Sequence, residues 1–259
     1  MKRCLSVATK AARSAGAVIV RHYRKLKSSD IHKKGKHDLV TKADFEANRV
    51  IIKTIKQYFP RHDFLSEETG FENNPDVYTW VVDPLDGTTN YAIGDPLFCT
   101  ALALVHKRDI LLSVIYAPLL KEFFVAVRGR GALLNGKKIR VSLLRKLENA
   151  VIVVGRSHRR SSHYSAEGIQ KKLERRAMNT RRLGSDSMDL AYVASGRVDG
   201  CLLVPPHISA WDSAPGVLLV REAGGRVSDF GGTEWHLGSS GVVASGGFIH
   251  RQLLKVVPP

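Results

Sequence analysis

The residues from Asp83 to Thr88 combine groups that could bind a metal ion and a phosphate. They read Asp-Pro-Leu-Asp-Gly-Thr, and a short β-prone run ends directly before them at Val82. We therefore expect Asp83 at the C-terminal end of a strand, followed by a turn in which Pro84 fixes one backbone angle and Gly87 permits a tight bend. Two carboxylates three residues apart on such a turn can converge on one point, and Mg²⁺ prefers oxygen ligands of this kind.

The residue after this turn could add a phosphate site. Thr88 can begin a short helix, and the amide groups of Gly87 and Thr88 would then face outward at the helix N-terminus, where an anion is stabilised. Taken alone, the run is better interpreted as an ordinary turn, because Asp, Pro and Gly are common turn residues and Thr often caps a helix.

Two further segments supply carboxylates in similar positions. Glu67, in Ser66-Glu67-Glu68, follows a β-prone run and would be a third carboxylate at a strand end. Asp212 stands directly before a helical stretch, so Pro215 is expected in the first helical turn, where proline is tolerated. Paired glutamates are usually solvated, and a lone Asp before a helix is usually a cap. The combination of all three segments favours a metal site.

The remaining pattern predicts a chain of two halves. Apolar residues at helical spacing predict helices over 4–26 and 42–58, and Asn135-Gly136 predicts a hairpin. The other predicted elements are strands over 99–106, 110–116, 121–128, 150–154 and 201–204, and helices over 162–177, 186–195, 212–223 and 248–257. We therefore predict an α+β half, residues 1–140, joined to an α/β half, residues 141–259.

Composition and charge narrow the class of protein. The chain of 259 residues can bury a sizeable core, and its three cysteines are too far apart to suggest a disulfide framework or a zinc ribbon, which favours a cytoplasmic location. No apolar run approaches the length that spans a membrane. The formal net charge of +16 attracts anions, whether small phosphates, nucleic acid or acidic lipid.

Much of the basic excess lies in residues 128–182. Single-stranded nucleic-acid sites usually interleave cations with aromatic side chains, but here only Tyr164 interrupts the main run of cations. A solvated helix face with flanking loops is the favoured interpretation of this segment.

Taken together, the acidic segments resemble the inositol monophosphatase family of Mg²⁺-dependent, lithium-sensitive phosphatases. The motifs that carry the resemblance are Ser66-Glu67-Glu68, Asp83-Pro84-Leu85-Asp86-Gly87-Thr88-Thr89-Asn90, Trp211-Asp212, Glu222-Ala223-Gly224-Gly225, Asp38-Leu39-Val40-Thr41-x-x-Asp44 and Gly129-x-Gly131-Ala132-x-x-Asn135-Gly136. The resemblance covers essentially the whole chain. It implies a layered αβαβα sandwich of the type shared with fructose-1,6-bisphosphatase, a homodimer, and a small phosphorylated metabolite as substrate.

The resemblance also implies roles for individual residues. Two to three Mg²⁺ ions per site would be held by Glu67, Asp83, Asp86, Asp212 and the carbonyl of Leu85. The catalytic residues would be Glu67, Asp83 and Thr88, with Glu67 and Thr88 orienting the attacking water. The substrate would contact Asp86, Gly87, Thr88, Ser185, Asp186 and Asp212. Support would come from Lys33, Asp38, Thr41 and Asp44. Two metal ions about 4 Å apart can stabilise both the attacking and the leaving oxygen, so no covalent intermediate is needed.

Two positions depart from the family pattern on the side of the leaving alcohol. Members typically have a glutamate seven residues before the aspartate of the Trp-Asp pair, where it binds sugar-alcohol hydroxyls, and this chain has Pro205 there. Asp186 adds a carboxylate within Gly184-Ser185-Asp186-Ser187. Because of both changes, the identity of the alcohol in the physiological substrate stays open. His207 is interpreted as a surface histidine.

Two alternatives to an inositol-phosphate-like substrate remain open. One is a protein that binds nucleic acid or a transcription complex, because some bacterial members of the family act with the ribosomal-RNA antitermination machinery and this chain is strongly basic. The other is a relative that acts on fructose 1,6-bisphosphate, histidinol phosphate or adenosine 3′,5′-bisphosphate, because a shared fold does not fix the substrate.

Overall fold

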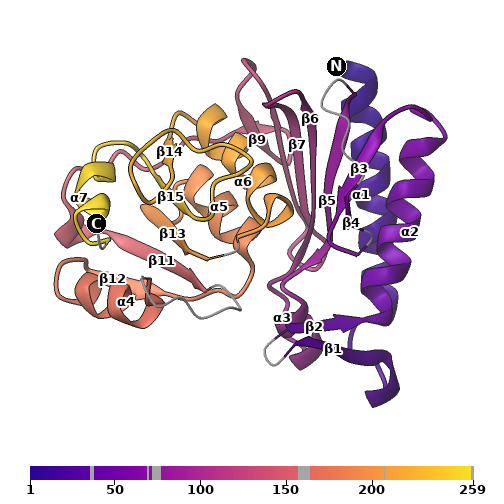
Figure 1. Ribbon diagram of the computed structural model, residues 1–259, viewed down its shortest axis with the longest axis horizontal. Coiled ribbons are helices and arrows are strands. Elements are labelled where there is room, and N and C mark those ends of the chain that lie inside the picture. Colours follow the sequence, from indigo (N-terminus) through magenta and orange to yellow (C-terminus); the bar gives the residue numbers. More distant parts are fainter. Residues whose placement is uncertain (36–37, 69, 72–76, 157–163, 207, 258–259) are drawn as a thin grey trace.

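The chain folds into five layers, which alternate between helices and sheets (Figure 1). The computed structural model describes all residues except 36–37, 69, 72–76, 157–163, 207 and 258–259. From one side to the other, the layers are helices α1 and α2, an eight-stranded sheet, helices α5 and α6, a five-stranded sheet, and helices α4 and α7. The predicted αβαβα sandwich is confirmed.

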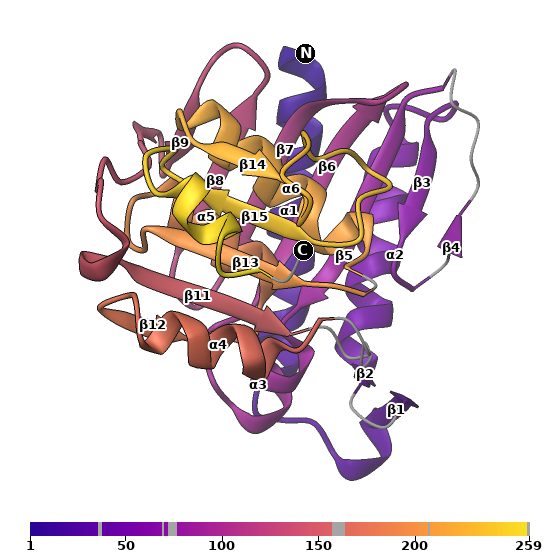
Figure 2. The ribbon, with the colours of Figure 1, turned by 60° about the vertical axis from the view of Figure 1, so that its left-hand side comes forward.

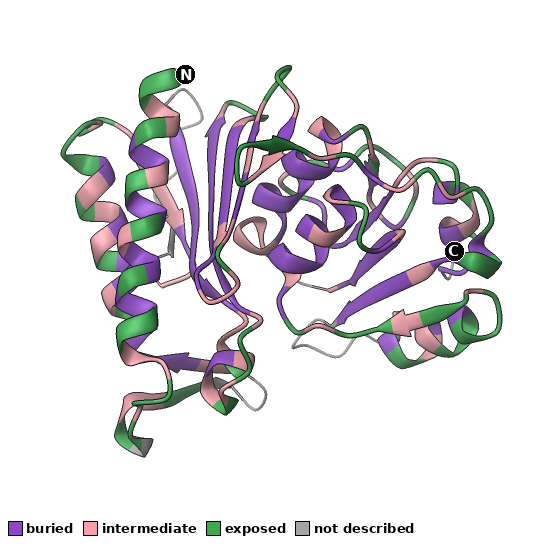
Figure 3. Cartoon of the chain, turned by 180° about the vertical axis from the view of Figure 1, so that it is seen from behind, coloured by how far each residue is buried: buried purple, intermediate pink, exposed green. Residues whose placement is uncertain are grey.

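The first layer consists of α1 (Lys2–His22) and α2 (Lys42–Lys56). Their buried faces carry small and aliphatic residues, among them Ala8, Ile19 and Ile51, which pack against one face of the larger sheet. Small residues let the two helices lie close to the sheet, while the opposite faces of both helices are exposed (Figure 3). Both helices were predicted, but α1 ends four residues earlier than expected, because Tyr23 adopts an extended backbone.

The larger sheet has the strand order β10-β9-β8-β7-β6-β5-β3-β4. Only the β3–β5 pair is parallel in this sheet. The bounds are β3 (Asp63–Ser66), β4 (Gly70–Phe71), β5 (Thr79–Asp86), β6 (Cys99–His106), β7 (Asp109–Ala117), β8 (Glu122–Val127), β9 (Ala132–Leu134) and β10 (Lys137–Lys138). Strands β5 and β6 are buried almost throughout because helices cover both faces of the sheet. Asn135 and Gly136 join β9 to β10 with positive φ angles of 49° and 79°, which confirms the predicted hairpin.

The middle layer consists of α5 (Asp186–Ala194) and α6 (Ala210–Glu222), which lie between the two sheets. Helix α6 begins two residues before Asp212, so the prediction that Pro215 lies in the first helical turn was wrong. Ser209 is the N-cap instead, and Pro215 lies inside the helix. The carbonyl of Pro215 accepts a hydrogen bond from the hydroxyl of Ser113 on β7 at 2.6 Å, which ties α6 to the larger sheet.

The smaller sheet has the order β12-β11-β13-β15-β14, and α4 and α7 cover its outer face (Figure 2). The bounds are β11 (Val151–Arg156), β12 (Asn179–Arg181), β13 (Gly200–Val204), β14 (Arg226–Ser228), β15 (Val242–Ser245), α4 (Ala166–Glu174) and α7 (His250–Leu254). Helices α4 and α7 are shorter than predicted, and residues 162–163 of the helix predicted over 162–177 lie outside the described residues.

Shorter elements complete the chain. A hairpin of β1 (Ile31–Gly35) and β2 (Asp38–Thr41) precedes α2, and α3 (Thr88–Ile93) follows β5. Single 3₁₀ turns occur at Ser28–Asp30 and Leu147–Asn149. The larger sheet ends at Lys138 and the smaller begins at Val151, but the division into two domains stays a prediction.

Neither a disulfide nor a membrane-spanning helix occurs among the residues that the structure describes. All three cysteines are free, and Cys99 and Cys201 are buried. Within the part of the chain that the structure describes, no helix combines the length and the apolar character needed to cross a bilayer. The cytoplasmic location expected from the cysteines stays a prediction.

Candidate active site

The acidic run begins inside strand β5 rather than after it. The prediction that Asp83 ends a strand was wrong, since β5 continues to Asp86. Asp83 pairs with Ala101 and Asp86 pairs with Cys99, so the register shifts between them. Pro84 has no amide hydrogen to donate to the neighbouring strand, which accounts for a break in the ladder at this point. Both carboxylates are buried, like the rest of β5.

Gly87 forms the tight bend that the sequence predicts. Its φ is +90°, and a Cβ atom there would lie 3.0 Å from the carbonyl oxygen of Leu97 and 3.3 Å from the Cα of Phe98. Both obstacles are backbone atoms, so only glycine fits without displacement. Thr88 then begins α3, and its hydroxyl lies 3.0 Å from the Leu85 carbonyl and 3.2 Å from Asp44 Oδ1.

Asp44 connects helix α2 to this bend. Its Oδ2 accepts hydrogen bonds from the amide and the hydroxyl of Thr41, at 2.8 and 2.6 Å. Burial raises the pKa of Asp44 to about 6, although the hydrogen bonds from Thr41 act in the opposite direction. Thr41 caps α2, so the helix start holds Asp44 against Thr88.

Glu67 and Asp212 come to the same region from different layers. Glu67 follows β3 directly, and its amide donates to the carbonyl of Val82 at 3.2 Å, one residue before Asp83. Asp212 is the third residue of α6, and its Oδ2 accepts the amide of Ser209 at 2.9 Å. The site therefore lies where the larger sheet meets the middle helical layer.

The carboxylates raise one another's pKa. Burial raises the pKa of Asp83 well above its ordinary value, and the charges of Glu67, Asp86 and Asp212 add to this effect. Asp212 is affected in the same way, by burial first and then by Asp186, Asp86 and Glu67. A divalent cation would relieve this repulsion, and carboxylate oxygens are the ligands that Mg²⁺ prefers, so the donor set fits the ion. Among the described residues, however, the side chains of Asp, Glu, His and Cys do not form a group of three or more whose present positions could hold a metal ion.

The segment before α5 adjoins the carboxylates through main-chain contacts. The amides of Asp186 and Ser187 donate to Asp86, at 3.2 Å to Oδ1 and 2.6 Å to Oδ2. Burial raises the pKa of Asp86, and the hydrogen bonds from Ser187 partly offset the rise. Ser185 is the buried N-cap of α5. The structure thus places Ser185 and Asp186 beside Asp86.

Three residues beside the predicted site were given no role by sequence reasoning. Asn90 donates to the carbonyls of Leu97 and Leu183, at 2.8 and 2.7 Å, and so links α3 to the segment before α5. Ser187 binds Asp86 through its amide. Asp189 is fully buried on α5. Two of them left a signal in the sequence: Asn90 ends the motif that begins at Asp83, and Asp189 is a charged residue on an otherwise mainly apolar helix.

Of the four residues predicted to support the site, only some lie beside the carboxylates and Thr88. Thr41 and Asp44 are buried beside Thr88, whereas Lys33 on β1 is exposed. The backbone of Asp38 pairs with that of Gly35, but the structure does not describe the side chain of Asp38. His207, which was interpreted as a surface histidine, also lies outside the described residues. Pro205 is buried, and its ring packs closely over Gly241.

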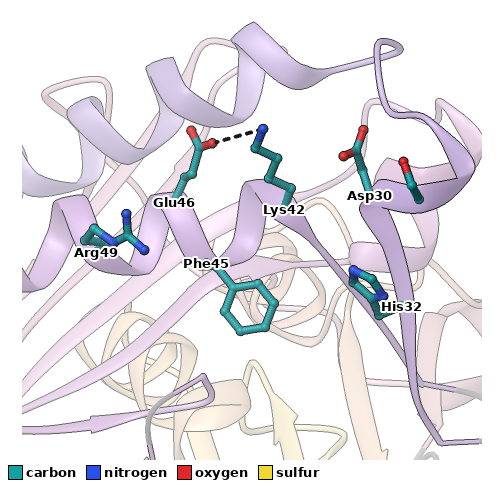
Figure 4. Close-up of a pocket in the computed structure, with 7 residues that line it drawn as sticks. Asp30, His32, Lys42, Phe45, Glu46 and Arg49 are labelled. Atoms are coloured by element: carbon teal, nitrogen blue, oxygen red, sulfur yellow. Dashed lines mark ion pairs between the residues drawn. The ribbon is translucent and has the colours of Figure 1, made fainter.

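A separate pocket of about 320 Å³ lies beside α2 (Figure 4). Its lining residues are Ser29, Asp30, His32, Lys42, Phe45, Glu46 and Arg49. Glu46 is already paired, since its carboxylate lies 2.7 Å from Arg21, 3.0 Å from His22 and 3.9 Å from Lys42. None of the residues predicted for the site lines this pocket.

Comparison with known proteins decides the family. The sequence model of the inositol monophosphatase family matches residues 1–258. The chain belongs to the inositol monophosphatase family. An inositol-1-monophosphatase of Mesorhizobium japonicum is 39% identical over 255 residues, which cover 98% of this chain and 95% of that protein. The protein named Nus factor SuhB in Xylella fastidiosa is 42% identical over 234 residues, which cover 90% of this chain and 84% of that protein.

Solved structures of inositol monophosphatase family proteins share the fold. The extragenic suppressor protein suhB of Bartonella henselae superposes with a TM-score of 0.92, at 35% identity and with 98% of each chain covered. The names of the relatives thus divide between inositol-1-monophosphatase and Nus factor SuhB. The chain is similar to both groups over nearly its whole length.

Proposed function

We propose that this protein is a Mg²⁺-dependent phosphatase that hydrolyses a small phosphate monoester to an alcohol and inorganic phosphate. The observation that carries the proposal is a cluster of four carboxylates, in which Asp83 and Asp86 are buried and Asp212 and Glu67 are half-buried. The charges of the other three raise the pKa of Asp83. A pure binding protein has no need of such a cluster, because burying charges together is unfavourable without a cation. Membership of the inositol monophosphatase family supports the same activity.

Different residues of this chain would bind the metal ions and the phosphate. Glu67, Asp83, Asp86, Asp212 and the Leu85 carbonyl would hold the Mg²⁺ ions. Bound Mg²⁺ would neutralise phosphoryl charge and make a water molecule more acidic. The amides of Gly87 and Thr88 would bind the phosphate.

The Thr88 hydroxyl would orient the attacking water. That hydroxyl lies 3.2 Å from Asp44 Oδ1, so it can donate a hydrogen bond to Asp44 and accept a hydrogen bond from the water at the same time. Glu67 would hold the water from the other side. The pKa of Asp44 is raised to about 6, which is still below neutral pH. The carboxylate is therefore largely ionised at pH 7 and can accept the hydrogen bond from Thr88.

A substrate panel tests the activity. Inorganic phosphate release would be measured with myo-inositol 1-phosphate, fructose 1,6-bisphosphate, histidinol phosphate and adenosine 3′,5′-bisphosphate, each with Mg²⁺ and with a chelator. Release that requires Mg²⁺ is expected for at least one compound. Absence of release from all of them would refute the proposal.

A second candidate function is binding of RNA within a transcription complex. Six exposed cations lie on α4, on the edge strand β12 and next to them, and we call them the α4–β12 basic surface: Lys171, Lys172, Arg175, Arg176, Arg181 and Arg182. A relative with 42% identity is named Nus factor SuhB. The two functions can coexist, because this surface and the carboxylate cluster belong to different layers.

Neutralising part of the α4–β12 basic surface should weaken RNA binding. We expect a variant with Lys171, Lys172, Arg175 and Arg176 all changed to Ala to bind a single-stranded RNA oligonucleotide less tightly. Its slope of log affinity against log salt should fall by about 0.7 for each lost phosphate contact. Gel shifts over a range of ionic strength would measure this. The matched control changes Lys137 and Lys138 to Ala on the exposed β10. Equal slopes in both variants would contradict the assignment of this surface.

A further inference from the structure

Two carboxylates outside the expected metal ligands lie side by side at the start of α5. Asp186 is the first residue of the helix, and Asp189 follows one turn later. Asp189 is fully buried, and neither of its carboxylate oxygens has a hydrogen-bond partner among the described residues. A buried polar group without a partner is rare in folded proteins, and each case calls for an explanation.

The two carboxylates both approach Gly155 on strand β11. A Cβ atom there would lie 2.9 Å from Asp186 Oδ1 and 3.5 Å from Asp189 Oδ2. It would also lie 2.6 Å from Leu203 Cδ2, so the absence of a side chain at Gly155 lets both carboxylates lie close to the strand beside Leu203. The leading electrostatic effect of a neighbour on Asp186 comes from Asp189, which agrees with their closeness.

The same pair adjoins the proposed catalytic cluster. The amide of Asp186 donates to Asp86 Oδ1 at 3.2 Å. Among the neighbouring carboxylates, Asp186 raises the pKa of Asp212 the most. Asp186 therefore contacts Asp86 through its amide and approaches Gly155 through its carboxylate. The charge of Asp86 also acts on Asp189, so the pair and the cluster adjoin each other.

Two adjacent carboxylates, of which Asp189 is fully buried and Asp186 half-buried, call for a positively charged partner that carries hydrogen-bond donors. Leaving one ion unpaired in the interior costs several kcal/mol. Mg²⁺ fits poorly between them, because it demands octahedral geometry and usually keeps several waters. An ammonium group offers three donors and forms strong hydrogen bonds with carboxylates.

We propose that this protein hydrolyses phosphate monoesters whose alcohol carries a protonated amine, and that Asp186 contacts the ammonium group while Asp189 reinforces the negative charge behind it. This inference rests on the phosphatase activity proposed above and specifies its substrate class. It makes Asp186 a specificity-determining residue: the phosphate would lie at Gly87 and Thr88, and the amine would extend toward α5.

A pair of matched substrates tests the inference. In 2-aminoethyl phosphate and 2-hydroxyethyl phosphate, the ammonium of one replaces the hydroxyl of the other. We expect kcat/KM to favour the amine by about 10–100-fold, as for hydrogen bonds to charged groups. In Asp186→Ala and Asp186→Asn the ratio should fall to near one, chiefly through a higher KM for the amine. The control Glu148→Gln removes a charge from an exposed turn and should leave the ratio as it is in the unmodified protein.

Other results would overturn the inference. A ratio near one in the unmodified protein would do so, and so would an unchanged ratio in Asp186→Ala. If the Asp186 variants instead need more Mg²⁺ for both substrates while the ratio is retained, Asp186 is a metal ligand and the assignment to the amine fails.

A binding measurement separates this inference from the proposed activity. Calorimetric titration with 2-aminoethylphosphonate and ethylphosphonate, in the presence of Mg²⁺, requires no hydrolysis. We expect the amine to bind about 10–100-fold more tightly to the unmodified protein and to lose this advantage in Asp186→Ala. If no ester is hydrolysed but the preference in binding is found, the activity fails and the amine site stands. If the two phosphonates bind equally, the amine site fails whatever the activity.

Discussion

Replacing Asp83 by asparagine is expected to lower kcat/KM for ester hydrolysis by more than about 100-fold, which exceeds the usual effect of changing a residue that only contacts a metal ligand. The chain should stay folded. Asparagine has nearly the same shape, and its side-chain oxygen can still accept the amide of Leu85, as Asp83 Oδ1 does at 3.0 Å. What is lost is one negative charge at the centre of the carboxylate cluster, and with it the affinity for the cation.

Two measurements check this expectation. Phosphate release at several Mg²⁺ concentrations gives the loss of activity, and circular dichroism gives the fold. The matched control is Asp109→Asn, which also removes one aspartate charge but lies on the surface, paired with Arg128. Full turnover in Asp83→Asn would refute the role of Asp83 as a metal ligand, and a loss of folded signal would show that Asp83 is needed for stability instead.

The metal-free protein is expected to lose stability as the pH rises from the ordinary aspartate value of 3.8 through about 6 and beyond, and Mg²⁺ should restore it. A carboxyl group whose pKa is raised by folding holds more protons in the folded state than in the unfolded state. Its favourable contribution is fully present below the unfolded pKa and is lost as the pH rises through the folded pKa. Asp44, with a pKa raised to about 6, acts in this direction. The pKa values of Asp83, Asp186, Asp189 and Asp212 are raised well above the ordinary aspartate value, so these groups act in the same direction.

One buried group acts in the opposite direction. Burial lowers the pKa of His250 to about 4, so its contribution is lost as the pH falls from the ordinary histidine value toward that pKa. His250 lies in the second half of the chain, between the hydroxyls of Ser245 and Ser228. The comparison therefore needs a reference protein that retains His250 and lacks part of the carboxylate cluster.

Asp83→Asn provides that reference. Thermal unfolding with a chelator should give a midpoint that falls more steeply with pH in the unmodified protein than in the variant. Mg²⁺ at about 100 times its dissociation constant should raise the midpoint of the unmodified protein by about 5–10 °C near neutral pH. The shift should be smaller at acidic pH, where the carboxylates are protonated. Parallel pH profiles for the two proteins would contradict the linkage.

Local sequence patterns were sufficient to predict most of the fold. The apolar faces of α1 and α2, the β-prone run of β6 and the Asn135-Gly136 turn each depend on residues close together in the chain. The boundaries were less accurate where a local signal has two interpretations. Ser209 and Asp212 have the spacing of a capping box, which would have located the start of α6, but Asp212 itself was considered as the cap.

The sequence could predict the site residues that lie in motifs, but not the contacts between segments far apart in the chain. Glu67, Asp83, Asp86 and Asp212 could be named because each lies in a recognisable segment. The hydrogen bond from Ser187 to Asp86 joins residues 101 positions apart, and that from Asn90 to Leu183 joins residues 93 positions apart. No local pattern records such contacts. The unpartnered state of Asp189 is likewise visible only once α5 is placed against β11.

The way in which Asp86 is held has an evolutionary consequence. Its two carboxylate oxygens accept hydrogen bonds from the main-chain amides of residues 186 and 187. The hydroxyl of Ser187 also contributes, since it donates to the carbonyl of Asp212 at 3.4 Å and its side chain is fully buried. Residue 186 holds Asp86 through its amide, and every amino acid except proline supplies such an amide, so the side chain at this position can change while Asp86 keeps its place. Directed evolution of new substrate preferences in this scaffold should begin at codon 186.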